Sequence, residues 1–295
     1  MVQIKADLGS ENMNQQTPQR KGEMVSEAGL PTFFIVGAMR SGTTSLHSYL
    51  RSHPDIYLHL KEPHFFDGKF ERGLEWYRTL FAEASAAEAV GESTPTYMYS
   101  DLALGRMREV VPNARLVAML RNPVERAYSH YWMNRAREKE SRTFEEAVQA
   151  EIDAGPETTT HYIDFGLYKR HLDRVCSFFD RSALHVELME DLQGEPGATY
   201  ERVCRFLEVD PLFRPPNLGQ PVNSFVTFRS VAGRRMAKRL PRPLKKVVGR
   251  LNAQKGAYPA MSNEMRSTLG DYFSEPNREL EAFLGRSTAD VWRVA

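Results

Sequence analysis

A glycine loop at residues 37–45 carries residue types that bind an anionic group. It follows the apolar run Phe33-Phe-Ile-Val36 and leads into a segment with helical periodicity. A loop between a buried strand and a helix presents backbone N–H groups to an anion at the positive end of the helix. The loop keeps the G-x4-G spacing of the Walker A motif, but Thr43 stands where the motif has its lysine. That lysine serves the β- and γ-phosphates of a nucleoside triphosphate, so this loop, with Arg40 inside it, suits a different anion.

Lys61-Glu-Pro-His-Phe-Phe-Asp67 is a second segment with reactive side chains. Pro63 restricts Glu62 to an extended conformation. If the two phenylalanines are buried, Glu62 and His64 project from a rigid segment, where a carboxylate can act as a general base. The alternative is a turn with charged residues on its surface, and an isolated Glu-x-His pattern would favour that alternative.

A third group of polar residues follows the apolar run 115–120, which is predicted to be a central parallel strand. Ligands bind at the carboxyl ends of such strands, and Arg121 comes directly after this one. Asn122 and Pro123 fit the N-cap and the first position of a helix, which puts Ser129 two turns into it. Arg121 can then reach an anion near the helix start, with Ser129 adding a hydroxyl. The alternative for Arg121 is a structural ion pair at a sheet edge.

The elements that position these residues alternate between apolar runs and helical periodicity. This alternation predicts an α/β fold with a mainly parallel sheet, of the P-loop-like nucleotide-binding type. A chain of 295 residues with 41% hydrophobic and 26% charged residues is expected to form one large soluble core. Strands are expected at 33–36, 89–91, 115–120 and 184–188, and helices at 43–52, from 123 onward, and at 143–153, 168–179, 197–207 and 262–284.

Two segments differ in composition from the rest of the chain. Residues 1–29 are rich in Gln, Asn, Ser, Glu and Lys and are predicted to be a disordered tail, with residues 30–295 forming the domain. Residues 211–263 contain no Asp or Glu, and a basic cluster runs from 229 to 250. That cluster is either a solvated surface helix or a lid that faces an anionic ligand or membrane surface.

Composition limits the kinds of binding partner and the cellular location that are expected. The net charge of +1 points to no polyanionic partner such as a nucleic acid. No apolar run approaches the ~18 residues of a membrane span, and the N-terminus has no apolar signal-peptide core. Cys176 and Cys204 belong to no metal-type cluster and fit a reducing compartment. A cytoplasmic protein without a metal or a transmembrane segment is therefore expected.

The order of these motifs resembles the sulfotransferases that use 3′-phosphoadenosine 5′-phosphosulfate (PAPS). Within them, the chain looks most similar to the heparan sulfate glucosaminyl sulfotransferase branch and its bacterial relatives, over about residues 32–284. The loop at 33–46 is similar to the family's 5′-phosphosulfate loop, and 121–129 to its 3′-phosphate motif. Residues 62–67 are similar to the segment with the catalytic glutamate, and Lys255-Gly256 to the C-terminal cofactor loop.

The resemblance implies a role for each matching residue. Backbone amides and hydroxyls of the loop cradle the phosphosulfate, and the C-terminal loop closes over the nucleotide. Glu62 removes the proton of an acceptor hydroxyl while His64 orients it. The implied catalytic residues are Arg40, Glu62 and His64, and the implied PAPS-binding residues are Arg40, Ser41, Gly42, Thr43, Thr44, Ser45, Arg121, Ser129, Lys255 and Gly256.

Two positions depart from the family pattern. Many relatives carry lysine where Arg40 stands. Because arginine stays protonated in proteins, Arg40 is expected to offset charge on the bridging oxygen rather than donate a proton. Ser93 stands where the heparan branch has a lysine near the acceptor, which argues against a heparan acceptor.

The implied reaction is sulfuryl transfer from PAPS to a hydroxyl of a carbohydrate or small metabolite, by in-line attack and without a metal. Two other classes remain open. A kinase with a degenerate P-loop would show magnesium-dependent use of ATP. A non-catalytic nucleotide-binding scaffold would bind adenosine 3′,5′-bisphosphate but transfer nothing.

Overall fold

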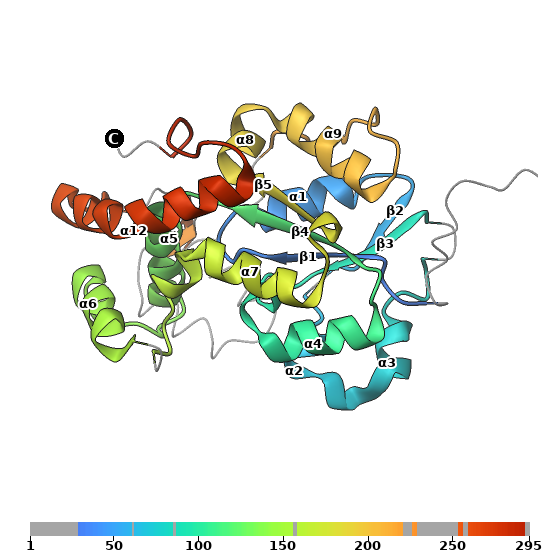
Figure 1. Cartoon of the computed structure of the whole chain (residues 1–295), viewed down its shortest axis with the longest axis horizontal. Coiled ribbons are helices and arrows are strands. Elements are labelled where there is room, and N and C mark those ends of the chain that lie inside the picture. The colour runs from blue at the N-terminus through green and yellow to red at the C-terminus, as the bar shows by residue number, and fades with distance from the viewer. Residues whose placement is uncertain are drawn as a thin grey trace, which may run out of the picture.

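A five-stranded parallel sheet with the order β2-β3-β1-β4-β5 forms the centre of the protein (Figure 1). The computed structural model of the chain describes residues 29–60, 62–84, 87–155, 158–220, 226–228, 253–255 and 259–292. The strands of the sheet are β1 (Phe33–Gly37), β2 (Ile56–Leu58), β3 (Ala89–Ser93), β4 (Arg115–Leu120) and β5 (Leu184–Leu188). A second, antiparallel pair consists of β6 (Val226–Phe228) and β7 (Ala253–Lys255).

Helices cover both faces of the sheet, with α1 and α9 on one face and α4 and α7 on the other (Figure 1). The helices are α1 (Thr43–Leu50), α2 (Phe65–Gly68), α3 (Gly73–Thr79), α4 (Asp101–Val110), α5 (Pro123–Ala136), α6 (Phe144–Ala154), α7 (Tyr168–Phe178), α8 (Met189–Gly194), α9 (Pro196–Leu207) and α12 (Asn263–Leu284). Within the described ranges, no helix combines the length and the apolar character needed to cross a bilayer.

The side chains of β1 point alternately into two hydrophobic clusters, one on each face of the sheet. Phe33 and Ile35 pack into the cluster under α1 and α9, whereas Phe34 and Val36 pack into the cluster under α4 and α7. All four side chains are buried. A strand covered on both faces reads as an unbroken apolar run, which is why the sequence predicts β1 and β4 so clearly.

The predicted α/β fold is confirmed. The four predicted strands are present, and the predicted helices agree with the observed ones to within about two residues. The sequence did not predict β2, which has three residues, or the helices α2, α3, α4 and α8. With three and four residues, β2 and α2 are too short to show a period of their own.

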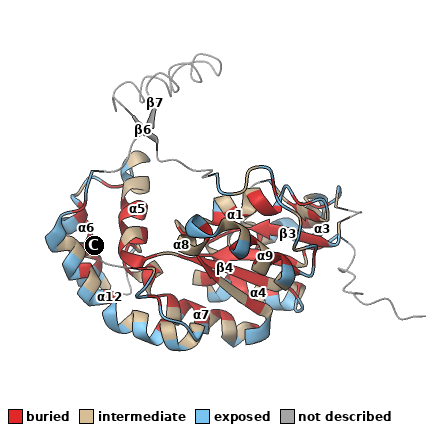
Figure 2. Ribbon diagram, turned by 90° about the horizontal axis from the view of Figure 1, so that it is seen from above, coloured by how far each residue is buried: buried red, intermediate tan, exposed pale blue. Residues whose placement is uncertain are grey.

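The start of α5 is fixed as predicted. Asn122 Oδ1 accepts hydrogen bonds from the amides of Val124 (3.0 Å) and Glu125 (3.4 Å), and Pro123 occupies the first turn. Buried residues lie along α5 and along the strands (Figure 2). Because only two residues separate the end of β4 from the start of α5, Arg121 is held at the carboxyl edge of the sheet, next to the end of β1.

Two parts of the predicted domain organisation lie outside the described residues. These are residues 1–28 of the predicted tail and the basic cluster at 229–250. The tail, the lid and the cytoplasmic location stay predictions. Cys176 and Cys204 are free thiols.

Candidate active site

The glycine loop turns sharply from β1 into α1. Arg40 has a φ of 73° and Gly42 a φ of 83°, so two residues in the left-handed region make the turn. A side chain at position 42 would also crowd Met189, because a Cβ atom on residue 42 would lie 3.1 Å from Met189 Cγ. The loop therefore requires glycine at 42, as the G-x4-G spacing predicts.

The first turn of α1 is left open to an anion. Gly42 caps the helix without a side-chain hydrogen bond, and the first turn holds no acidic residue. Within the described part of the chain, the amides of Gly42, Thr43 and Thr44 donate to no backbone carbonyl. Thr44 is exposed, whereas Ser41 is buried. Open amides at the positive end of a helix fit the phosphosulfate group that the resemblance implies.

Residues from three elements meet beside this loop. Arg40 Nε donates to Ser129 Oγ at 3.0 Å, and Arg121 Nη1 lies 3.5 Å from the Arg40 carbonyl oxygen. The Arg121 carbonyl accepts a hydrogen bond from the Tyr168 hydroxyl at 2.8 Å. Arg121 Nη2 lies 3.8 Å from Glu125, a distance too long for a strong ion pair. The structure thus brings together Arg40, Arg121 and Ser129, and the guanidinium of Arg121 is not locked by its carboxylate neighbour.

The second reactive segment forms a chain of polar contacts. His64 Nε2 lies 3.3 Å from Glu62 Oε2, and His64 Nδ1 lies 3.1 Å from Asp67 Oδ2. Asp67 in turn accepts a hydrogen bond from Thr96 Oγ1 at 2.6 Å. The Glu62 side chain is 56% exposed, so its carboxylate is accessible to a substrate. Asp67 and Thr96, which orient the imidazole, were not among the predicted site residues.

The backbone that carries this segment is anchored in the core. Phe65 and Phe66 are fully buried, as the prediction for a rigid segment required. Their amides donate to the Tyr97 hydroxyl, at 3.0 Å and 3.3 Å. The short helix α2 begins at Phe65, directly after His64, which adopts a φ of 53°. The contacts with Tyr97 therefore fix the backbone next to Glu62 and His64.

Glu92 holds Tyr97 in place. Its buried carboxyl group accepts hydrogen bonds from the hydroxyls of Tyr77 (2.7 Å), Tyr97 (3.1 Å) and Thr94 (3.0 Å). Burial raises the pKa of Glu92 to about 7, although the three hydroxyl donors oppose that rise. No spacing pattern marks this network: Glu92, Thr94 and Tyr97 lie close together in the chain, but the bond from Tyr77 and the burial of the carboxyl group arise only in the fold.

A cavity of about 350 Å³ joins the glycine loop to the Glu62 segment. Burial, with a smaller contribution from the Arg51 charge, lowers the pKa of His47 to about 4, so this imidazole is neutral at pH 7. The lining residues are Thr43, Thr44, His47, Leu60, Glu62, His64 and Ser93. Glu62 and the start of α1 therefore line the same open pocket.

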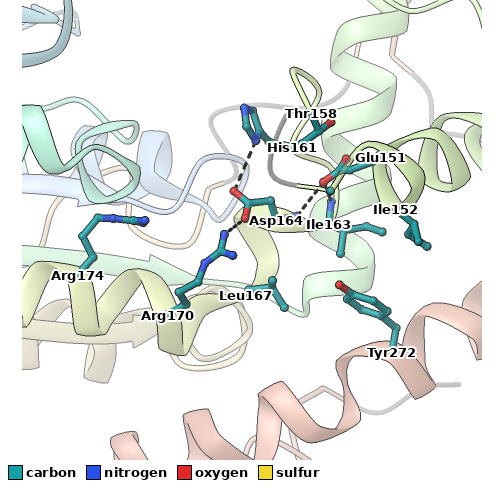
Figure 3. A pocket seen from close by; sticks show the side chains of 11 residues that line it. Glu151, Ile152, Thr158, His161, Ile163, Asp164, Leu167, Arg170, Arg174 and Tyr272 are labelled. Atoms are coloured by element: carbon teal, nitrogen blue, oxygen red, sulfur yellow. Dashed lines mark hydrogen bonds and ion pairs between the residues drawn. The ribbon is translucent and has the colours of Figure 1, made fainter.

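A larger cavity of about 500 Å³ lies between α6, α7 and α12 (Figure 3). Its charged side chains are engaged with neighbours: Arg170 pairs with Asp164, and Arg174 pairs with Asp101 at 3.0 Å. The carboxylate of Glu151 accepts hydrogen bonds from the backbone. None of the predicted site residues lines this cavity, so the smaller one is the candidate active site.

The remaining predicted residues are placed only in part. Ser45 lies in the first turn of α1. Lys255 ends β7, but its side chain and the whole of Gly256 lie outside the described residues. Over the described ranges, no group of three or more His, Cys, Asp and Glu side chains is arranged to hold a metal ion.

The site therefore combines a P-loop-like glycine loop, which lacks the P-loop lysine, with the carboxylate of Glu62 in the same cavity. Residues 30–238, more than half of the chain, match the family described as the sulfotransferase domain. The chain therefore belongs to the sulfotransferase family, and the predicted PAPS-dependent enzyme class, near the heparan sulfate branch, is confirmed.

Individual relatives agree with this assignment. Mouse heparan sulfate glucosamine 3-O-sulfotransferase 3B1 is 27% identical over 290 residues, which cover 95% of this chain and 72% of the relative. Human heparan sulfate glucosamine 3-O-sulfotransferase 6 is 35% identical over 178 residues, which cover 60% of this chain and 52% of the relative. The crystal structure of a sulfotransferase from Alicyclobacillus acidocaldarius superposes with a TM-score of 0.69 at 28% identity, covering 90% of this chain and 99% of that one.

Proposed function

We propose that this sulfotransferase transfers the sulfuryl group of PAPS to a hydroxyl of a carbohydrate or small-metabolite acceptor. The observation that carries the proposal is the cavity in which Glu62 faces Thr43 and Thr44, at the start of α1. A carbohydrate acceptor is also supported by the relatives, which are named for the glucosamine of heparan sulfate.

The loop and its neighbours fit a nucleotide with phosphates at two positions. The open amides at 42–44 suit the 5′-phosphosulfate. Arg121 and Ser129 lie beside the loop and suit the 3′-phosphate, which distinguishes this nucleotide from ATP. When bound, PAPS supplies an activated sulfuryl group on a bisphosphate leaving group.

In the proposed reaction, Glu62 accepts the proton of the acceptor hydroxyl as its oxygen forms a bond to sulfur. His64 keeps the carboxylate in place, because its other ring nitrogen is held by Asp67. The bond between sulfur and the bridging oxygen breaks, and its electron pair stays with the bisphosphate. Arg40 and the loop amides offset the charge that develops there. The proposed reaction uses no metal.

Calorimetric titration with adenosine 3′,5′-bisphosphate, compared with ATP and magnesium, tests the cofactor assignment. We expect tight binding of the bisphosphate and little response to ATP. Preference for ATP would instead favour the degenerate kinase. Transfer of labelled sulfate to a panel of neutral and acidic saccharides and hydroxylated metabolites then tests the acceptor class. Bisphosphate binding without any transfer across that panel would favour the non-catalytic scaffold.

A further inference from the structure

Arg126 is a fully buried arginine in α5 without a matching negative charge. Its Nη2 donates to the carbonyl oxygens of His161 (3.4 Å) and Tyr162. Its Nε and Nη1 are buried and have no hydrogen-bond partner. The guanidinium therefore meets carbonyl oxygens, and no carboxylate of the described residues bonds to it. A buried, uncompensated charge is strongly unfavourable for folding, so its presence calls for a function.

Arg126 lies on the helix that carries Ser129, one residue of the proposed cofactor site. It precedes Ser129 by three residues, so the two side chains are neighbours on one face of α5. Ser129 itself is hydrogen-bonded to Arg40 of the glycine loop at 3.0 Å. In the sequence, Arg126 lies between Arg121 and Ser129, the two residues proposed to bind the 3′-phosphate, and its side chain is buried in the protein interior.

The groups around Arg126 connect it to the loop without a direct contact. The Arg126 charge opposes the rise in pKa that burial causes in Tyr99 and in Tyr168. The Tyr99 hydroxyl accepts a hydrogen bond from the Met39 amide of the loop at 3.2 Å. The Tyr168 hydroxyl donates to the carbonyl oxygen of Arg121. Two tyrosines near Arg126 therefore contact the glycine loop and the residue that follows β4.

The buried imidazole of His130 adds no positive charge to this region. Burial, followed by the charges of Arg126 and Arg40, lowers the pKa of His130 to about 2. The ring of His130 is thus neutral, and it adds no charge of its own beside the two arginines. The low dielectric of this buried region also screens the two guanidinium charges only weakly.

We infer that Arg126 is a positioning residue for the cofactor, and that its buried charge acts through the loop to favour a doubly phosphorylated nucleotide. The phosphates then supply the negative charge that the folded chain lacks at this place. This inference rests on the proposed function. It differs from a purely structural role, in which Arg126 would only tie α5 to the carbonyl groups of His161 and Tyr162.

Binding measurements with ligands of increasing charge separate the two roles. The dissociation constants of adenosine 3′,5′-bisphosphate, adenosine 5′-monophosphate and adenosine are compared in the full-length wild type and in Arg126→Gln, which keeps hydrogen-bond donors but removes the charge. We expect Arg126→Gln to weaken binding of the bisphosphate roughly 10-fold or more, of the monophosphate less, and of adenosine hardly at all. Arg126→Lys should restore most of the charge dependence.

A surface variant controls for the change in net charge. Arg108→Gln removes one exposed positive charge from α4 and should leave all three dissociation constants unchanged. Equal losses for the three ligands in Arg126→Gln, or no loss, would overturn the inference. If both Arg126→Gln and Arg126→Met fail to fold, the charge has a structural role and the inference is again overturned. Failure of the wild type to bind the bisphosphate would instead contradict the proposed function itself.

Discussion

The Nε atom of Arg40 and the Oγ atom of Ser129 are 3.0 Å apart, although the two residues are separated by 89 positions in the chain. This hydrogen bond joins the glycine loop to α5. The residue proposed to face the leaving group is therefore held by the residue proposed to bind the 3′-phosphate. Occupation of the 3′-phosphate site should accordingly affect the orientation of Arg40.

Glu62→Gln should lower turnover by roughly 10²–10⁴-fold, the range expected for loss of a general base. Affinity for adenosine 3′,5′-bisphosphate should stay nearly unchanged, because the amides and arginines of the cofactor site are intact. Initial rates of labelled sulfate transfer, together with calorimetry, measure both quantities. Glu71→Gln, which removes the charge of an exposed glutamate near Glu62 in the sequence, is the matched control. Near-normal turnover in Glu62→Gln would remove Glu62 from the role.

Arg121→Ala should weaken binding of adenosine 3′,5′-bisphosphate far more than binding of adenosine 5′-monophosphate. The physical reason is that a charged hydrogen bond to the 3′-phosphate is lost only with the first ligand, at a cost of about 1.5–3 kcal/mol. Titration of both ligands into both proteins gives the comparison. Equal losses for the two nucleotides would show that Arg121 does not read the 3′-phosphate.

Asp67→Asn should reduce turnover by roughly 10-fold or more, because the imidazole of His64 loses the partner that fixes its orientation toward Glu62. Thr96→Val removes only the hydrogen bond to Asp67 and should have a smaller effect. Binding of the bisphosphate serves as the control for correct folding of the loop. If both variants keep full turnover, the contacts of His64 do not contribute to catalysis.

Glu92 should make the protein less stable as the pH rises from about 4.5 to about 7. Its pKa is raised in the folded state, so the folded chain keeps the proton while the unfolded chain releases it. The contribution of Glu92 to the free energy of unfolding is complete below pH 4.5. It is lost as the pH approaches 7, by an amount on the order of 3 kcal/mol.

Urea unfolding of the wild type and of Glu92→Gln at several pH values tests this dependence. The other titrating groups are common to both proteins, so the difference between the two curves isolates Glu92. We expect the difference in free energy of unfolding to change between pH 5 and pH 7.5. A difference independent of pH would mean that Glu92 has an ordinary pKa in the folded protein.

The sequence predicted those parts of the fold and site that are local. The apolar runs of β1 and β4 and the cap at Asn122 are each encoded within a few neighbouring residues. The loop at 37–45 and the pair Glu62 and His64 carry recognisable spacing. In contrast, the contact of Asp67 with Thr96, and those of the Phe65 and Phe66 amides with Tyr97, depend on how separate segments pack. No spacing along the chain reports such contacts, because they arise only after the sheet has formed.

Arg126 illustrates the same limit for a single residue. In the sequence it is one of several arginines in a helical segment, where a charged side chain normally faces solvent. Only the structure shows that its guanidinium is enclosed and meets backbone carbonyls. Charge counts from the sequence therefore cannot separate it from the exposed arginines.

The left-handed backbone of Arg40 limits which residues can evolve at that position. Asparagine and glycine adopt a φ of 73° readily, whereas valine, isoleucine and threonine do so only with strain. Selection at position 40 thus acts twice, once on chain geometry and once on charge. A saturation library sorted only for soluble expression should already be poor in β-branched residues there, before any activity is selected.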